Sequence, residues 1–167
     1  ETETFISMKK ILFFLLFLST FTFAQSNLEI IQIIINNHQY FEGKKSEKNN
    51  VKIKFDSVYT HIQDEYLVEG IAEIDDKISK FSGKISFNTK QTKKLRDPNI
   101  YNFDVTLSEE KIADNSEFFK GSLNIKIGPK LFNIIVFEGV YQDENVKSPM
   151  YFDNSNQIMK YLESLKK

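Results

Sequence analysis

The residues best suited to acid–base or metal chemistry are few in this sequence. The two histidines are His38 and His61, and no His-x-x-His, Asp-x-Asp or Ser/His/Asp pattern frames either. Pairs of adjacent acids fall in expected turns and are Asp75-Asp76, Glu109-Glu110 and Asp143-Glu144. A two-carboxylate hydrolase needs its acids held at a fixed separation across a cleft. The sequence therefore predicts no catalytic residue and no metal ligand, and a hydrolase that uses turn carboxylates is the less favoured alternative.

One short segment carries an excess of positive charge. Its four cations stand against the single acid Asp97, and they are Lys90, Lys93, Lys94 and Arg96. Such a segment can contact an anionic glycan, a lipid headgroup or an acidic protein, and the alternative is a solvated loop. The chain has a net charge of -1, which argues against a nucleic-acid partner because such partners usually need a basic surface. No glycine-rich phosphate loop precedes a helix, and we expect no cofactor.

The strands that must position these residues share a frame of an apolar residue, a polar residue and glycine. Five of the six glycines stand in this frame, which begins at Phe41, Val68, Phe81, Phe119 and Phe137. Residues two apart in a strand face the same side. A glycine inside a strand costs about 0.5–1 kcal/mol relative to alanine, unless aromatic side chains fill the space and let a coiled sheet close. We therefore expect a closed antiparallel barrel with Gly83 and Gly121 under aromatic rings, and an open sheet or sandwich is the alternative.

Alternating apolar and polar residues predict seven or eight strands in an up-and-down meander. The expected strands cover 40–44, 51–59, 66–74, 78–88, 100–107, 117–127, 132–142 and a short 149–152. The strand 132–142 is apolar on both faces, so both should be covered. We expect a helix over about 155–165 to pack outside it through Ile158, Met159 and Leu162. Residues 28–37 fit either a short helix or a strand.

The first residues have the pattern of a cleaved secretory signal peptide. Lysines after Met8 precede the apolar run 11–18, and Thr22-Phe23-Ala24 supplies the small residues before a cleavage that leaves Gln25 first. The run is shorter than the roughly 20 residues of a spanning helix. We expect a leader over 1–24, a single domain over 25–167, export to the periplasm or medium, and no membrane span after cleavage. The chain has no cysteine, which excludes thiol catalysis and thiolate metal sites.

Together, the signal peptide, the coiled meander with Phe-x-Gly strand openings and the C-terminal helix resemble calycin-type, lipocalin-like barrels. More narrowly, they resemble small secreted barrels of Gram-negative bacteria, which mostly lack an assigned function. Phe41-Glu42-Gly43-Lys44 stands near the place of the lipocalin Gly-x-Trp motif, and this chain has no tryptophan.

The resemblance implies a binding module that holds a small apolar ligand in the barrel or contacts a protein or glycan partner through its loops. The residues expected to line the interior are Phe55, Phe81, Phe87, Tyr101, Phe103, Phe119, Phe137 and Tyr141. The alternative is an inhibitor or a structural envelope protein without a pocket.

Overall fold

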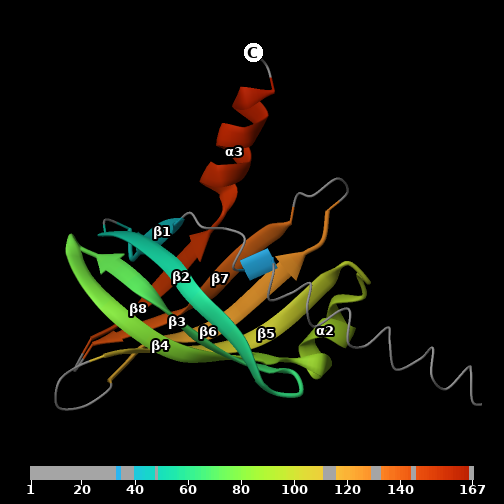
Figure 1. Ribbon diagram of the computed structural model, residues 1–167, viewed down its shortest axis with the longest axis horizontal. Helices are drawn as coiled ribbons and strands as arrows, with labels where there is room; N and C mark the ends of the chain where they lie inside the picture. The colour runs from blue at the N-terminus through green and yellow to red at the C-terminus, as the bar shows by residue number, and fades with distance from the viewer. Residues whose placement is uncertain are drawn as a thin grey trace, which may run out of the picture. The chain divides into compact units, whose positions relative to one another are not determined.

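Eight antiparallel strands form a closed barrel in a computed structural model of the chain (Figure 1). The structure describes residues 33–34, 40–47, 49–110, 116–128, 133–143 and 146–165. The chain divides into two compact units, Glu1–Ile34 and Ile35–Lys167, and the barrel belongs to the second. Of the first unit, Ile33 and Ile34 are described, and both are helical. The expected signal peptide and most of the segment 28–37 lie outside the described residues.

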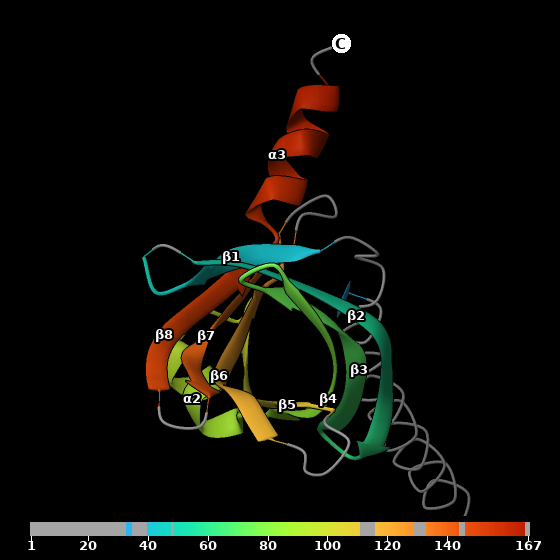
Figure 2. The same ribbon diagram turned by 90° about the vertical axis from the view of Figure 1, so that its left-hand side faces the viewer.

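The strands follow one another around the barrel in chain order, and β8 pairs with β1 to close it (Figure 2). Their bounds are β1 Phe41–Lys45, β2 Asn49–Ile62, β3 Glu65–Ile74, β4 Lys77–Phe87, β5 Ile100–Glu109, β6 Ser116–Lys126, β7 Ile134–Asp143 and β8 Val146–Asp153. Every observed strand overlaps the range expected from the alternation of apolar and polar residues. The prediction of a closed antiparallel meander is therefore confirmed.

Two irregularities in the strand pairing change which residues face the interior. Between β2 and β3 the pairing skips Asp56, so Phe55 and Val58 are both buried although they are three residues apart. Between β5 and β6 the pairing skips Phe118, and Phe118 and Phe119 are both buried although they are consecutive. A bulge adds one residue to a strand and re-aims the side chains around it. A strict period of two therefore fails at both places.

The glycine frames face inward, as expected, because the apolar residue that opens each frame is buried. Gly70 lies between Phe55 and Phe81 in the strand register. A Cβ atom at Gly70 would meet the Lys54 carbonyl oxygen first and would also lie 2.8 Å from the ring of Phe81. The two rings meet edge to face with their centroids 5.5 Å apart. At this position aromatic rings fill the space that the missing side chain leaves.

At Gly83 and Gly121, unlike Gly70, no aromatic ring is among the nearest atoms. A Cβ atom at Gly83 would meet the Thr106 carbonyl oxygen and would lie 2.7 Å from the Leu107 side chain. A Cβ atom at Gly121 would meet the Glu138 carbonyl oxygen and would lie 2.6 Å from the Cα atom of the facing glycine. The expected aromatic cover is therefore corrected here to a close approach of two strands, which glycine alone permits.

The C-terminal helix α3, Ser155–Ser164, forms where expected but does not pack on the barrel. None of its residues is buried. Ile134 and Val140, on the outer face of β7, remain 46% and 42% exposed. The expected packing of Ile158, Met159 and Leu162 on this strand is therefore wrong.

Hydrogen bonds at the start of α3 attach it to the strands on both sides of β8. The Asn156 side chain donates to the Glu42 carboxylate at 2.6 Å, and the Gln157 side chain donates to the Tyr40 carbonyl oxygen at 2.9 Å. These acceptors belong to β1 and to the residue before it.

The N-cap residue Asn154 bonds the β7 side instead, because it accepts from the Ile135 backbone N–H at 2.9 Å and donates to the Asn133 carbonyl oxygen at 2.8 Å. The start of α3 is therefore anchored to both neighbours of β8, and the rest of the helix extends away from the barrel (Figure 1).

The close approach at Gly83 predicts the effect of adding a side chain there. Gly83→Val should lower the free energy of unfolding by about 1–3 kcal/mol or more, because the added atoms overpack against backbone that cannot move independently. The control is Lys84→Val, which places the same side chain on the exposed outer face of β4. Urea unfolding of both variants measures the difference. Equal midpoints for the two variants would contradict the close approach.

Candidate functional site

The central section of the barrel interior is occupied by aromatic rings in mutual contact. Phe137 stacks on Phe152 with centroids 4.4 Å apart and on Phe55 at 5.5 Å. Phe41 meets both Phe55 and Phe137 edge to face, at 5.7 and 5.5 Å. All four side chains are at most 2% exposed. Rings at these separations are in favourable contact, so the interior at this level is a packed core.

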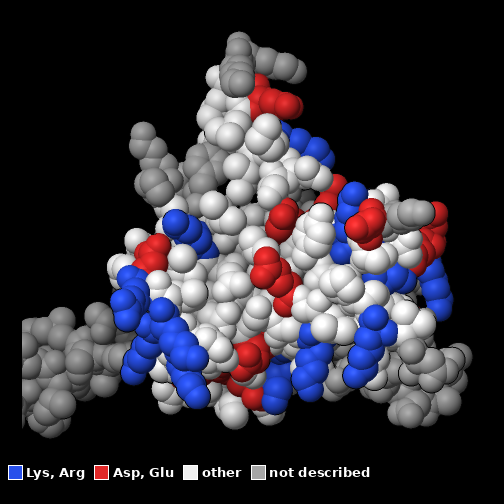
Figure 3. Space-filling model, turned by 180° about the vertical axis from the view of Figure 1, so that it is seen from behind, with Lys and Arg blue, Asp and Glu red and all other residues white. Residues whose placement is uncertain are grey.

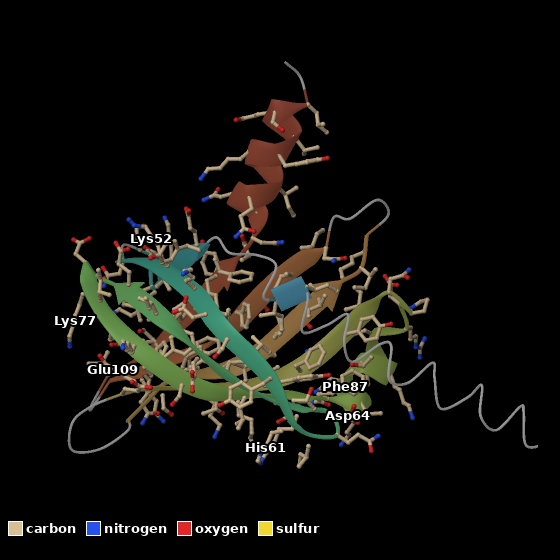
Figure 4. All side chains as sticks on the ribbon, in the orientation of Figure 1. Lys52, His61, Asp64, Lys77, Phe87 and Glu109 are labelled. Carbon is tan, nitrogen blue, oxygen red and sulfur yellow. The ribbon has the colours of Figure 1, made fainter. Side chains whose placement is uncertain are left out.

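A second group of rings lies at the end of the barrel that carries the β2–β3 turn. Tyr66 and Phe103 are fully buried and meet with centroids 6.4 Å apart. Phe87 is half-buried and lies 5.3 Å from Phe103 and 6.4 Å from Tyr101. In Figure 4, Phe87 lies near Asp64 at this end, and its backbone N–H donates to the Asp64 carbonyl oxygen at 2.7 Å.

The structure divides the expected interior residues into two classes. Five are fully buried, and they are Phe55, Phe81, Phe103, Phe119 and Phe137. Three are half-buried, and they are Phe87, Tyr101 and Tyr141. The Nζ atom of Lys45 lies 4.3 Å from the centroid of the Tyr141 ring, which is within the range of a cation–π interaction.

Four further buried aromatic residues were not among the expected set. They are Phe41, Tyr66, Phe118 and Phe152. Phe41 opens a glycine frame and could have been found by that signal. Phe118 could not, because a bulge turns it inward. Whether any of these side chains contacts a ligand stays a prediction.

The basic segment between β4 and β5 forms a helix, α2, Thr89–Leu95, which the sequence analysis did not predict. Asn88 caps it, because the Asn88 side-chain oxygen accepts a hydrogen bond from the Gln91 backbone N–H at 2.9 Å. The Asn88 amide also donates to both carboxylate oxygens of Asp104 at 3.0 Å. Asn88 thus joins the start of α2 to β5.

A second polar contact holds the middle of α2 on β5. The backbone N–H of Asn102 donates to the Thr92 hydroxyl at 2.9 Å. The Asn102 side chain is 7% exposed and donates to the Asn124 side-chain oxygen on β6 at 2.8 Å. No residue of α2 is buried, and Leu95 remains 44% exposed. Hydrogen bonds rather than apolar packing therefore attach α2 to the barrel wall.

The four cations of this segment, Lys90, Lys93, Lys94 and Arg96, are all exposed, and we call them the α2 cationic surface. Lysine and arginine side chains gather over α2 on the face shown in Figure 3. Lys93 and Lys94 lie in the last turn, where the helix dipole favours positive charge. Arg96 ends the helix in the left-handed conformation, with φ of 55°.

No ion pair within the described part of the chain includes a member of the α2 cationic surface. The one acid of the segment, Asp97, instead lies 3.8 Å from Lys126. Elsewhere on the barrel some lysines have nearby acids, as in the pairs Lys52–Glu73 at 2.9 Å and Lys84–Glu65 at 3.0 Å. Exposed strand lysines such as Lys44 and Lys120 also have no ion pair among the described residues. The α2 cationic surface differs from them in being a cluster, with four cations within the segment 90–96.

The acids and histidines that could do catalytic chemistry do not converge in the described residues. Asp75 and Asp76 form the β3–β4 turn, and Asp75 pairs with Lys45 at 2.5 Å. His61 is exposed near the end of β2, whereas His38 lies outside the described residues. Across the described ranges, no three His, Cys, Asp or Glu side chains could together hold a metal ion.

Comparisons with protein-family models, with curated proteins and with solved structures found no match for this chain. Among the helices that the structure describes, none is both long and apolar enough to cross a membrane.

The buried phenol of Tyr66 predicts a loss of stability at alkaline pH. Burial, with a smaller effect of Asp64, raises the pKa of Tyr66. Because the folded protein holds this phenol neutral to a higher pH than the unfolded chain does, the phenol contributes to the free energy of unfolding. This contribution is complete below the pKa of a free tyrosine, about 10, and it is lost as the pH rises further. Tyr66→Phe should therefore reduce the fall in unfolding free energy between pH 8 and pH 11.

The control for this measurement is Tyr59→Phe, because Tyr59 is 46% exposed. Its removal should leave the fall in unfolding free energy unchanged. If the two variants respond alike to pH, the neutral buried phenol is not what alkaline pH disrupts.

The Asn88 cap predicts how α2 responds to a single substitution. Asn88→Ala should lower the free energy of unfolding by about 1 kcal/mol, because it removes an N-cap together with the bonds to Asp104. Gln91→Ala, at an exposed position of the same helix, is the matched control and should have little effect. Thermal unfolding distinguishes them. A loss confined to Gln91→Ala would overturn the assigned role of Asn88.

Proposed function

We propose that this protein is an exported, non-enzymatic binding module that recognises an anionic partner through the α2 cationic surface. Export is supported by the n-region, apolar run and cleavage pattern of the first 24 residues. Recognition on the outer surface is supported by the packing of the interior. The observation that carries the proposal is the set of four exposed cations on a fixed helix, with no carboxylate paired to them among the described residues.

The interior is the less favoured place for a ligand. Binding sites for small molecules are cavities of several hundred Å3 lined by apolar groups. Here the apolar groups that would line such a cavity touch one another across the barrel, as in the contacts of Phe137 with both Phe55 and Phe152. A ligand at this level would have to displace rings from a packed core.

The chemistry of the α2 cationic surface fits a ligand that carries several carboxylate, sulfate or phosphate groups. Lysine ammonium groups act as mobile point charges, whereas the guanidinium of Arg96 can bind an oxyanion with two parallel hydrogen bonds. The polar anchors of Asn88 and Thr92 fix the helix, so little backbone ordering is needed on binding. An anionic glycan and an anionic lipid headgroup share this chemistry.

Removal of the α2 charges should weaken this recognition. Changing Lys90, Lys93, Lys94 and Arg96 to Gln should weaken binding to a sulfated polysaccharide at least tenfold and flatten its dependence on salt, because screened ionic contacts are lost. Parallel measurements on vesicles with and without anionic lipid distinguish a glycan from a headgroup.

The control variant changes Lys44, Lys77, Lys80 and Lys120 to Gln. These lysines are exposed and lie on the strands, so the net charge changes by the same amount at other places. Equal weakening by the two variants would show a non-specific charge effect. Absence of binding by the parent to every polyanion tested would refute the proposal.

A further inference from the structure

One residue of the α2 cationic surface has a backbone conformation that its side chain disfavours. Arg96, directly after the last residue of α2, is left-handed, with φ of 55° and ψ of 13°. A helix that ends this way usually has glycine there, because a Cβ atom disfavours this conformation. The other described non-glycine residues with positive φ have short polar side chains, which tolerate it better, and they are Ser46, Asp64, Asp75 and Asp76. Arg96 thus puts a long side chain where the backbone favours glycine.

Hydrogen bonds after Arg96 fix this conformation. The backbone N–H of Ile100 donates to the Asp97 carbonyl oxygen at 3.2 Å, and the backbone N–H of Asn99 donates to the Asp97 carboxylate at 2.9 Å. The same carboxylate lies 3.8 Å from Lys126, so the acid next to Arg96 in the sequence is directed to other partners. Because α2 is anchored on the other side, Arg96 is held between two fixed segments.

The positions of two lysines in α2 are unfavourable for the helix itself. Lys90 lies in the first turn, which contains no acid, and the helix dipole disfavours a cation there. Lys90 and Lys94 are four residues apart, so they are neighbours on the helix surface and repel each other. Features that disfavour the local structure concentrate at functional sites. Binding of an anion explains the positions of Lys90, Lys94 and Arg96, whereas local stability does not.

The type of cation at position 96 indicates what it binds. Arg96 is the one arginine of the chain, which has lysine at its other basic positions. A lysine ammonium is a point charge, whereas a guanidinium presents a planar fork that matches two oxygens of one oxyanion. Arg96 therefore adds geometric selection to a surface that otherwise attracts any anion.

The composition of α2 favours a polysaccharide over a membrane as the anionic partner. A helix that lies in a bilayer surface buries an apolar face among the lipids. Leu95 is the one apolar residue of α2, so the helix has no such face. A hydrated chain that carries repeated anionic groups needs only the charges and hydrogen-bond donors that α2 presents.

We propose that Arg96 is the specificity-determining residue of the α2 cationic surface and that it holds a sulfate or carboxylate group of an anionic polysaccharide by two parallel hydrogen bonds. Lys90, Lys93 and Lys94 attract the same chain through charge alone. This inference rests on the proposed function, because it names the ligand class and the selecting residue of the same site. Since the arginine is retained for binding, affinity and stability should change in opposite directions when glycine replaces it.

Exchange of the guanidinium for an ammonium tests the selection. Arg96→Lys keeps the charge, and it should weaken binding to dextran sulfate or polygalacturonate roughly fivefold or more, because the paired hydrogen bonds are lost. The dependence of affinity on salt should stay unchanged, whereas Lys94→Gln, which removes a charge, should flatten it. Lys94→Arg is the matched control and should bind at least as tightly as the parent. Calorimetric titration at several salt concentrations measures all four proteins, and the polysaccharide that the parent binds more tightly identifies the preferred oxyanion.

Thermal unfolding separates a binding role of Arg96 from a structural one. Arg96→Gly should weaken binding at least as much as Arg96→Lys does. Its melting temperature should nevertheless equal or exceed that of the parent, because glycine adopts the left-handed conformation without strain. Lys93→Gly, inside the same helix, is the control and should lower the melting temperature.

The outcomes distinguish this inference from the proposed function. A parent that binds neither polysaccharide nor phosphatidylserine vesicles would refute both, whereas binding to the vesicles alone would refute only the polysaccharide. If the parent binds a polysaccharide and Arg96→Lys binds it equally well, the α2 cationic surface remains the site but the role of Arg96 is wrong. A lower melting temperature of Arg96→Gly would show that the arginine serves the fold.

Discussion

The fold depends on the pairing of large side chains with glycine around a closed barrel. Phe55, Gly70 and Phe81 show the arrangement, since the two rings meet over the backbone of the glycine between them. Burial of a phenylalanine stabilises the fold by about 1.5–3 kcal/mol, whereas a glycine inside a strand costs about 0.5–1 kcal/mol. The gain from burying the rings therefore exceeds the cost of the glycine, and the glycine allows strands to approach closely enough to close the sheet.

Because of the same packing, we assign binding of a partner to the exterior of the barrel. Rings that touch across the barrel leave its interior as a core, so the distinguishing chemistry lies in the two helices outside. The helix α2 is attached by hydrogen bonds and presents charge, whereas α3 is held at its first turn and presents apolar side chains. Each helix has a rigid start and an exposed surface, and the barrel serves as the support that fixes both.

The sequence predicted the parts of the structure that depend on local pattern. The period of two and the turn residues were sufficient for the eight strands, and the spacing of Phe and Gly in the frames was sufficient for their inward direction. The bulge at Phe118 was not predictable from alternation, because an extra residue reverses the facing of its neighbours. The helix α2 was missed because its stability comes from Asn88 and Thr92 contacts with β5, which are distant in sequence.

The direction of α3 could not be predicted for a similar reason. The apolar stripe indicated a helix that needs a partner, but its start is fixed by hydrogen bonds of Asn156 and Gln157 to the β1 side and of Asn154 to the β7 side. The candidate site was likewise predictable only in part. The cations of α2 were identified from composition, whereas the buried Asn102 beneath them has no signal in the sequence, because its burial requires the helix.

The central claim is that the barrel interior is a packed core and that binding occurs outside it. Native mass spectrometry of residues 25–167, purified without denaturation from the periplasm or medium, tests this most directly. We predict a mass that the polypeptide alone accounts for, with no retained apolar molecule. A small apolar ligand that survives purification and is lost on Phe137→Trp would contradict the account, because it would show that the interior opens to a guest.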